Sequence, residues 1–134
     1  MIVIDTSAII ALIKGEADAV SIAMCIGTAS QRHISAGSLL ECGIVLGANY
    51  GPPGISAMRE LLGGLNLETV AVDSEQSRIG YEAFRRFGRG SGHAAGLNFG
   101  DCFSYALAKS RNLPLLFKGD DFIHTDIEPA LRPA

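Results

Sequence analysis

The sequence predicts a single α/β domain built on a central parallel sheet of about four or five strands, with helices on both faces. Its length of 134 residues is typical of one domain. Hydrophobic residues make up 48% of the chain and charged residues 19%, which provides enough apolar material for one core. Short apolar runs alternate with helical patterns, as they do in βαβ units. We therefore expect one domain over residues 1–134.

The first half of the chain opens with an apolar run at residues 2–4, which indicates a buried strand. Asp5, Thr6 and Ser7 come next, and all three residue types are favoured at helix N-caps. A short helix should therefore follow and end at Gly15. The remaining elements expected here are a helix over 18–30, a strand at 32–34, a helix over 35–49, and a helix from residue 53 or 55 to 65 that the glycines at 63 and 64 should break.

The second half continues the alternation of strands and helices. Residues 67–72 alternate in the manner of a strand, and Asp73 followed by Gln76 is a capping-box pattern that should begin a helix ending at residue 87. A glycine-rich loop is expected over residues 88–100, followed by a helix that Asn98 caps and that ends near residue 110. A last strand is expected at 115–117, with a loop or a single helical turn after it.

The charge balance argues against a protein that binds nucleic acid by charge alone. Lys and Arg number 11, Asp and Glu number 14, and the net charge is −3; such a protein should instead be basic. Any contact with nucleic acid then requires metal ions or a local basic patch. Three widely spaced cysteines argue against a disulfide framework or a zinc site. Because no apolar run approaches the roughly 20 residues of a membrane span, we expect a cytoplasmic protein that does not bind membranes.

Acidic residues stand where predicted strands end or the neighbouring helices begin. Asp5 follows the first strand, Asp120 and Asp121 follow the last one, and Asp101 lies in the first turn of the preceding helix. Taken singly, each has a purely structural use as a helix cap or in a turn. In open parallel sheets, however, ligands bind at the carboxyl ends of the strands. We therefore expect these acids to meet in one crevice.

Glu41 lacks such a structural use, because it falls in the predicted helix over 35–49 beside an apolar stripe. The neighbours of Glu41 at helical spacing are Ser38, Ile44, Val45 and Ala48, and most of them belong to this stripe. The apolar residues of the helix are Leu39, Leu40, Ile44, Val45 and Leu46. A carboxylate on a packed helix face costs free energy unless a positive charge meets it. Several carboxylates in one crevice also raise each other's pKa values unless a cation separates them. Oxygen ligands favour Mg²⁺ or Mn²⁺ over zinc, so the acids together predict a site for a hard divalent cation.

Three stretches of the chain carry a resemblance to a known family. Residues 2–8 resemble the opening of PIN-domain proteins, residues 98–108 resemble their third motif, and residues 115–127 resemble the last. Glu41 falls where the second acid of the family is expected. The length resembles that of VapC-type toxins of type II toxin–antitoxin pairs. The resemblance implies a PIN-like fold and an endoribonuclease that depends on Mg²⁺ or Mn²⁺ and hydrolyses RNA phosphodiester bonds.

The resemblance also implies roles for individual residues. Asp5, Glu41 and Asp101 match the acids that hold the metal, and Ser7 matches a small hydroxyl residue that supports them. A metal-bound water would attack the phosphate and leave 5′-phosphate and 3′-hydroxyl ends.

The fourth acid departs from the family pattern. Gly119 stands where many relatives have an Asp. Asp120 or Asp121 would have to serve as the fourth catalytic acid, and Asp120 is preferred, with Asp121 in a supporting role.

Substrate and partners follow from the same resemblance. Arg85, Arg86 and Arg89 cluster at the end of the helix over 73–87 and in the loop after it, where they are candidates to bind RNA phosphates. A VapB-type antitoxin would cover the acidic crevice with a basic or aromatic segment. The toxin would form a homodimer, for which the candidate apolar residues are Leu39, Leu40, Leu61 and Leu62.

Two other functions stay open from the sequence. A PIN-like domain with weak catalysis would act through partner binding, and the departure at Gly119 keeps this alternative alive. A receiver domain also places acids at strand ends, but it would need a second acid beside Asp5, where Thr6 stands.

Overall fold

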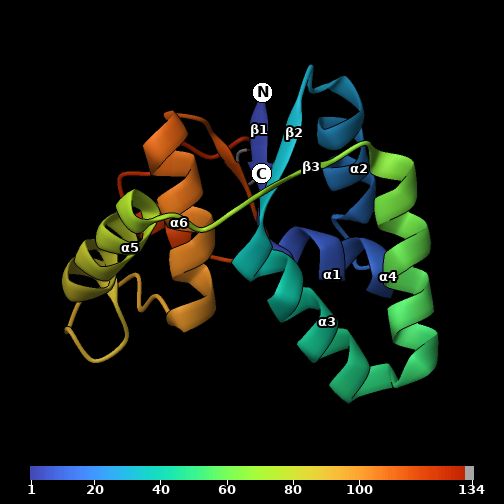
Figure 1. The fold of residues 1–134 in the computed structure, drawn as a ribbon, viewed down its shortest axis with the longest axis horizontal. Coiled ribbons are helices and arrows are strands. Elements are labelled where there is room, and N and C mark those ends of the chain that lie inside the picture. The colour runs from blue at the N-terminus through green and yellow to red at the C-terminus, as the bar shows by residue number, and fades with distance from the viewer. Residues whose placement is uncertain (132–134) are drawn as a thin grey trace.

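The computed structural model describes residues 1–131 and contains a four-stranded parallel sheet (Figure 1). The strand order is β3-β2-β1-β4, and every neighbouring pair is parallel. The strands are β1 (Ile2–Ile4), β2 (Arg32–Ser35), β3 (Glu68–Val70) and β4 (Leu115–Leu116). The predicted α/β class and parallel sheet are confirmed. The last three residues of the expected domain, 132–134, lie outside the described part.

Helices cover both faces of this sheet. They are α1 (Thr6–Lys14), α2 (Ala19–Thr28), α3 (Ala36–Tyr50), α4 (Pro52–Leu65), α5 (Ser74–Phe87) and α6 (Phe99–Arg111), followed by a short 3₁₀ turn, η1 (Phe122–His124). Figure 1 shows α5 and α6 on one side of the strands and α1 to α4 on the other. Successive residues of β1 point to opposite faces. Val3 accordingly joins the core beneath α5 and α6, while Ile4 joins the core beneath α1 to α4.

The helix boundaries follow the capping residues of the sequence. Asp5 caps α1 with its side chain, and Gly15 ends that helix in the left-handed conformation at φ 64°. Asn98 and Asp101 form a reciprocal capping box at the start of α6. Helix α4 begins at Pro52, earlier than predicted, because Pro is compatible with the first turn of a helix. The glycines at 63 and 64 do not break α4, which continues through them to Leu65.

The apolar stripe predicted for the helix over 35–49 is wrong in part. Leu40 is 66% exposed and Ile44 is 63% exposed. The buried face of α3 is instead formed by Ser38, Cys42 and Leu46. Two of these residues, Ser38 and Cys42, are small, and the Ser38 hydroxyl hydrogen-bonds that of Ser104 on α6 at 2.9 Å, so α3 and α6 pack closely at this point.

The two homodimer candidates on α4 are only partly exposed. Leu61 and Leu62 on α4 are half-buried and pack against the core beneath α1 to α4. Within residues 1–131, no helix is long and apolar enough to cross a membrane.

Candidate functional site

Four carboxylates line one cleft at the carboxyl ends of the strands. They belong to Asp5 after β1, Glu41 on α3, Asp101 on α6 and Asp121 after β4. The cleft has a volume of about 240 Å³. The other residues that line it are Thr6, Ser7, Ile10, Val45, Asn98, Lys118 and Phe122. Four separate segments of the chain therefore bring their acids together, as the strand-end argument predicts.

Asp5 is fixed by hydroxyl groups from two helices. Its side chain is almost fully buried, and Oδ1 accepts a hydrogen bond from the Ser104 hydroxyl at 2.5 Å. Oδ2 accepts from both the backbone N–H and the hydroxyl of Ser7, at 3.0 and 2.6 Å. Sequence reasoning anticipated Ser7 but missed Ser104. The available signal was its place three residues after Asp101, on the same helix face.

Asp101 lies in the first turn of α6 and takes part in the capping box. Its Oδ2 accepts the backbone N–H of Asn98 at 3.0 Å, and its own N–H donates to the Asn98 side chain at 2.9 Å. Burial raises the pKa of Asp101 to about 7, and the negative charges of the other cleft acids add to this rise against the opposing Asn98 hydrogen bond. The carboxylates are therefore close enough to repel one another.

Glu41 reaches this group because the residue facing it on α6 is glycine. A Cβ atom built on Gly100 would overlap the Glu41 carboxylate. Burial raises the pKa of Glu41, the charge of Asp5 acts in the same direction, and the nearby Thr6 hydroxyl opposes them. The Phe99-Gly100-Asp101 sequence therefore has a packing purpose: it brings two acids from different helices side by side.

The structure does not support the preference for Asp120 as the fourth acid. Asp121 lines the cleft, and its charge contributes to the raised pKa of Asp101. Both Asp120 and Asp121 are exposed, but Asp120 lies outside the cleft lining. The reason is the backbone at Gly119, whose φ of 102° turns the chain sharply after Lys118. Sequence spacing does not reveal the direction of such a turn.

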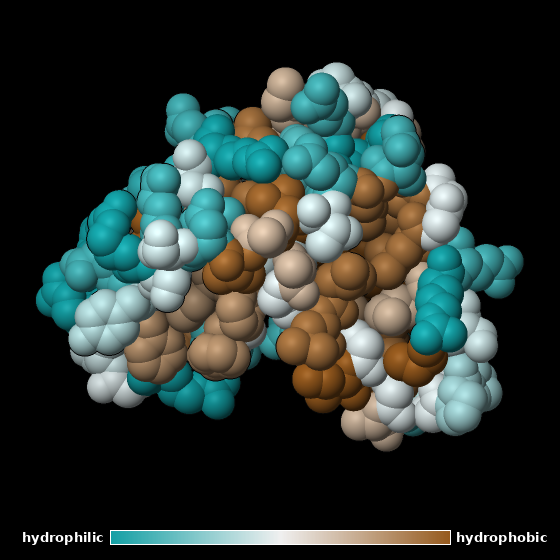
Figure 2. Space-filling view, viewed as in Figure 1, coloured by the Kyte–Doolittle hydropathy of each residue, from teal (hydrophilic) through white to brown (hydrophobic). Residues whose placement is uncertain are grey.

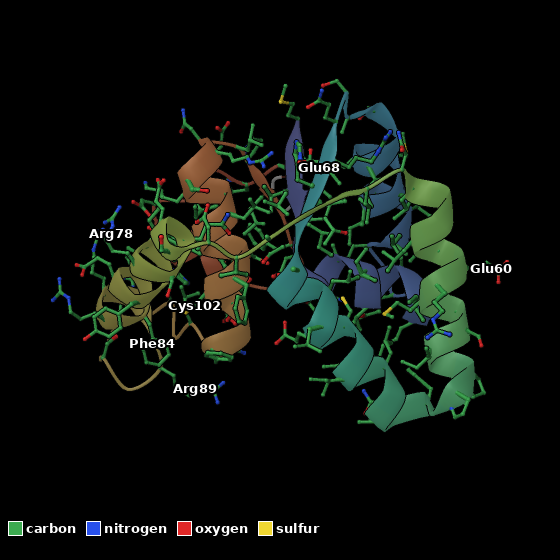
Figure 3. The ribbon with its side chains drawn as sticks, viewed as in Figure 1. Glu60, Glu68, Arg78, Phe84, Arg89 and Cys102 are labelled. Carbon is green, nitrogen blue, oxygen red and sulfur yellow. The ribbon has the colours of Figure 1, made fainter. Side chains whose placement is uncertain are left out.

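The three arginines predicted to bind RNA occupy different surroundings. Arg85 forms an ion pair with Glu82 on the exposed side of α5, and Arg86 lies over the Phe87 ring at 4.6 Å. Arg89 is nearer to the acids in the chain fold, because its backbone N–H donates to Leu97, which directly precedes the α6 cap. Figure 3 shows Arg89 beside the beginning of α6, whereas Arg78 points away from the outer face of α5.

The donor set of the cleft fits a hard divalent cation. Carboxylate oxygens are the ligands that Mg²⁺ and Mn²⁺ prefer, and the four carboxylates of the cleft outnumber the one basic residue of its described lining, Lys118. Among residues 1–131, no three His, Cys, Asp or Glu side chains already lie close enough together to hold a metal ion. The hydrogen bonds to Asp5 and Asp101 show instead an open set of acids, each held by its own protein donors.

The structure is thus an α/β domain with a parallel sheet and a cleft of acidic side chains at the carboxyl ends of its strands. The model of the PIN domain matches residues 2–128, and the chain belongs to the PIN-domain family. Because the chain belongs to this family, the receiver-domain alternative is excluded.

Curated relatives match the chain over nearly its whole length. Ribonuclease VapC28 of Mycobacterium tuberculosis is 49% identical over 129 residues, which cover 96% of this chain and 97% of the relative. Ribonuclease VapC42 of the same species is 41% identical over 128 residues, covering 96% and 98%. The crystal structure of M. tuberculosis VapC20, a toxin that cleaves the sarcin–ricin loop, superposes with a TM-score of 0.78 at 18% identity and covers 99% of this chain and 100% of that one. This last likeness shows that the fold is shared.

Proposed function

We propose that this protein is the toxin of a type II toxin–antitoxin pair, and that it is an endoribonuclease dependent on Mg²⁺ or Mn²⁺. The observation that carries the proposal is the convergence of Asp5, Glu41 and Asp101 on one cleft. The 49% identity to a VapC ribonuclease over nearly the full length supports the same activity. The proposal takes the whole chain, residues 1–134, as one PIN domain that works in the cytoplasm.

Some side chains of the cleft would hold the metal ion, and others orient the carboxylates that bind it. Asp5, Glu41 and Asp101 would hold the cation. Asp121, the residue directly before η1, adds a fourth carboxylate to the cleft. When bound, the cation would activate a water and offset charge on the phosphate oxygens. Ser7 and Ser104 fix both oxygens of Asp5, and the Asn98 cap fixes Asp101. Asp5 and Asp101 are thus oriented before substrate arrives, so less reorganisation of these two acids is needed during the reaction.

A VapB-type antitoxin is the partner that this site implies. The acidic cleft would attract a basic or aromatic segment that covers the carboxylates and blocks RNA. A solved structure of VapBC2 from Rickettsia felis, bound to a DNA fragment from the promoter, matches this chain with a TM-score of 0.73 at 15% identity. It covers 96% of each chain.

A homodimer belongs to the same proposal. Figure 2 shows apolar side chains on both sides of a notch between α3 and the α5–α6 side of the molecule. Leu40 and Ile44 are exposed on α3, and Tyr81 and Phe99 are exposed on α5 and α6, at 71% and 76%. An apolar groove of about 350 Å³ also runs between α5 and α6. Exposed apolar surface of this kind marks protein contacts more often than free surface.

Cleavage of RNA by purified protein tests the proposed activity. We expect cleavage with Mg²⁺ or Mn²⁺, none with EDTA, and loss of activity in Asp5→Asn, Glu41→Gln and Asp101→Asn. Glu60→Gln is the matched control, because Glu60 points away from α4 into solvent (Figure 3). Equal cleavage by all variants would indicate a contaminating nuclease. Binding of the antitoxin without any RNA cleavage would favour the alternative of a PIN-like domain that acts through partner binding.

A further inference from the structure

Lys118 is the single basic residue among those that line the acidic cleft in the described part of the chain. Its ammonium group forms an ion pair with Glu16 and lies 3.5 Å from Asp18 Oδ1. Both acids belong to the turn between α1 and α2. That oxygen of Asp18 is buried and has no hydrogen-bond partner, and its ion pair with the Lys118 ammonium group offsets its charge. The carboxylates of Glu16 and Asp18 therefore hold the Lys118 side chain by electrostatic attraction.

The backbone of Lys118 is tied to the first metal-binding acid. Its N–H donates to the Ser7 hydroxyl at 2.9 Å, and that hydroxyl donates in turn to Asp5 Oδ2 at 2.6 Å. Both ends of Lys118 are thus fixed, the backbone relative to Asp5 and the side chain relative to Glu16. About a third of the side chain remains exposed, with a relative accessibility of 33%. An ammonium group has three N–H donors, so it can donate a hydrogen bond to a further partner in the cleft.

We propose that Lys118 binds a backbone phosphate of the RNA beside the cleavage point, and that Glu16 and Asp18 hold its ammonium group in place. The inference rests on the proposed ribonuclease function. Four carboxylates in the cleft repel a polyanion, and a metal ion offsets this charge only at its own position. Lys118 is the residue of the cleft lining that can offer an N–H donor and positive charge to a phosphate. The arginines of α5 lie outside the cleft lining, and Arg85 pairs with Glu82.

The test compares Lys118→Met with Lys118→Arg and with Lys14→Met. Lys14 is exposed in the last turn of α1 and outside the cleft, which makes it a matched control. For cleavage of a fluorescent single-stranded RNA, Lys118→Met should raise KM by about tenfold, with a smaller effect on kcat. The Arg variant keeps the charge and should restore most of the affinity. Lys14→Met should behave as the parent protein does.

A second measurement separates the phosphate contact from a merely structural clamp. Binding of the same RNA is followed by fluorescence anisotropy at several salt concentrations, in an Asp101→Asn background that does not cleave. Loss of one phosphate contact should lower the slope of log K against log salt by about 0.7. A clamp alone would lower the melting temperature and kcat and leave this slope unchanged, and that result would overturn the inference.

The two proposals fail in different ways. Absence of cleavage by the parent protein would refute the ribonuclease function, whereas the salt slope of binding would still report on Lys118. Cleavage by the parent protein, with the same KM and salt slope in Lys118→Met as in Lys14→Met, would refute the inference alone.

Discussion

Gly100 has no side chain, and this leaves the space in which Glu41 can share one cleft with Asp101. A methyl group at this position would overlap the Glu41 carboxylate. We therefore expect Gly100→Ala to displace Glu41 and to lower RNA cleavage by about 100-fold, because shifts near 1 Å in a catalytic group have effects of that size. Cleavage rate and melting temperature together check this.

The control for Gly100→Ala is Gly64→Ala. A Cβ atom on Gly64 has open space around it in the α4 helix, so this change should stabilise the protein by up to about 1 kcal/mol and leave cleavage unchanged. Full activity in Gly100→Ala would show that the position of Glu41 at Gly100 has no role in catalysis.

Asp101 gives a pH-dependent prediction for the metal-free protein. Burial and the neighbouring carboxylates raise its pKa from 3.8 to about 7. Between these values the folded protein binds more protons than the unfolded chain, so the free energy of unfolding falls as pH rises through this window. Asp101→Asn removes this charge. The variant should melt at a higher temperature than the parent at pH 8 in EDTA, and the difference should shrink toward pH 4.

Thermal unfolding over this pH range, followed by circular dichroism, is the measurement. A difference in melting temperature that is constant from pH 4 to pH 8 would contradict the raised pKa of Asp101.

At the scale of elements, the sequence identifies helix ends better than helix faces. Asp5 and Asn98 were predictable caps because capping depends on a few neighbouring residues. The orientation of α3 was not predictable from its apolar residues. Its buried face depends on how closely α6 approaches, and small side chains such as Ser38 make that approach possible. Leu40 and Ile44 are exposed as a result.

The same distinction applies to the site. Glu41 was identifiable because a carboxylate beside an apolar stripe lacks a local use. For Ser104 the sequence offers only its place three residues after Asp101, and it offers no signal that Asp121 rather than Asp120 lines the cleft. Ser104 donates to Asp5 across 99 positions of sequence, and the direction of the chain after Gly119 depends on one backbone angle. Contacts of this range arise only from the folded arrangement of α6 and β4 against β1.

A second contact of α6 fastens the segment after η1 and should contribute mainly to stability. The Tyr105 hydroxyl donates to Asp126 Oδ1 at 2.6 Å, and Lys109 donates to Oδ2 at 2.7 Å. Tyr105→Phe removes the first of these bonds from a buried ring, and we expect a loss of about 1 kcal/mol in the free energy of unfolding. Urea unfolding measures the loss. A variant as stable as the parent would show that this hydrogen bond does not contribute to the free energy of unfolding.

For the whole molecule, the exposed residues of α3 make the proposed homodimer testable. Ile44→Lys places a charge in the apolar surface of α3 and should convert a dimer into a monomer, since an unpaired charge in an interface is costly. Light scattering coupled to size exclusion reports the mass. Val20→Lys is the matched control, because Val20 is 72% exposed on α2. A dimer that persists in Ile44→Lys but is lost in Val20→Lys would place the interface on the opposite side.

Calorimetric titration of Mn²⁺ into the metal-free protein tests most directly whether one cation is shared by acids from distant parts of the chain. Asp5→Asn, Glu41→Gln and Asp101→Asn should each weaken binding by about 10–100-fold or more, because even partners outside the ligand shell have effects of that size. Glu60→Gln should bind Mn²⁺ as the parent does. If the three cleft variants bound Mn²⁺ with the affinity of the parent, these carboxylates would not form one metal site.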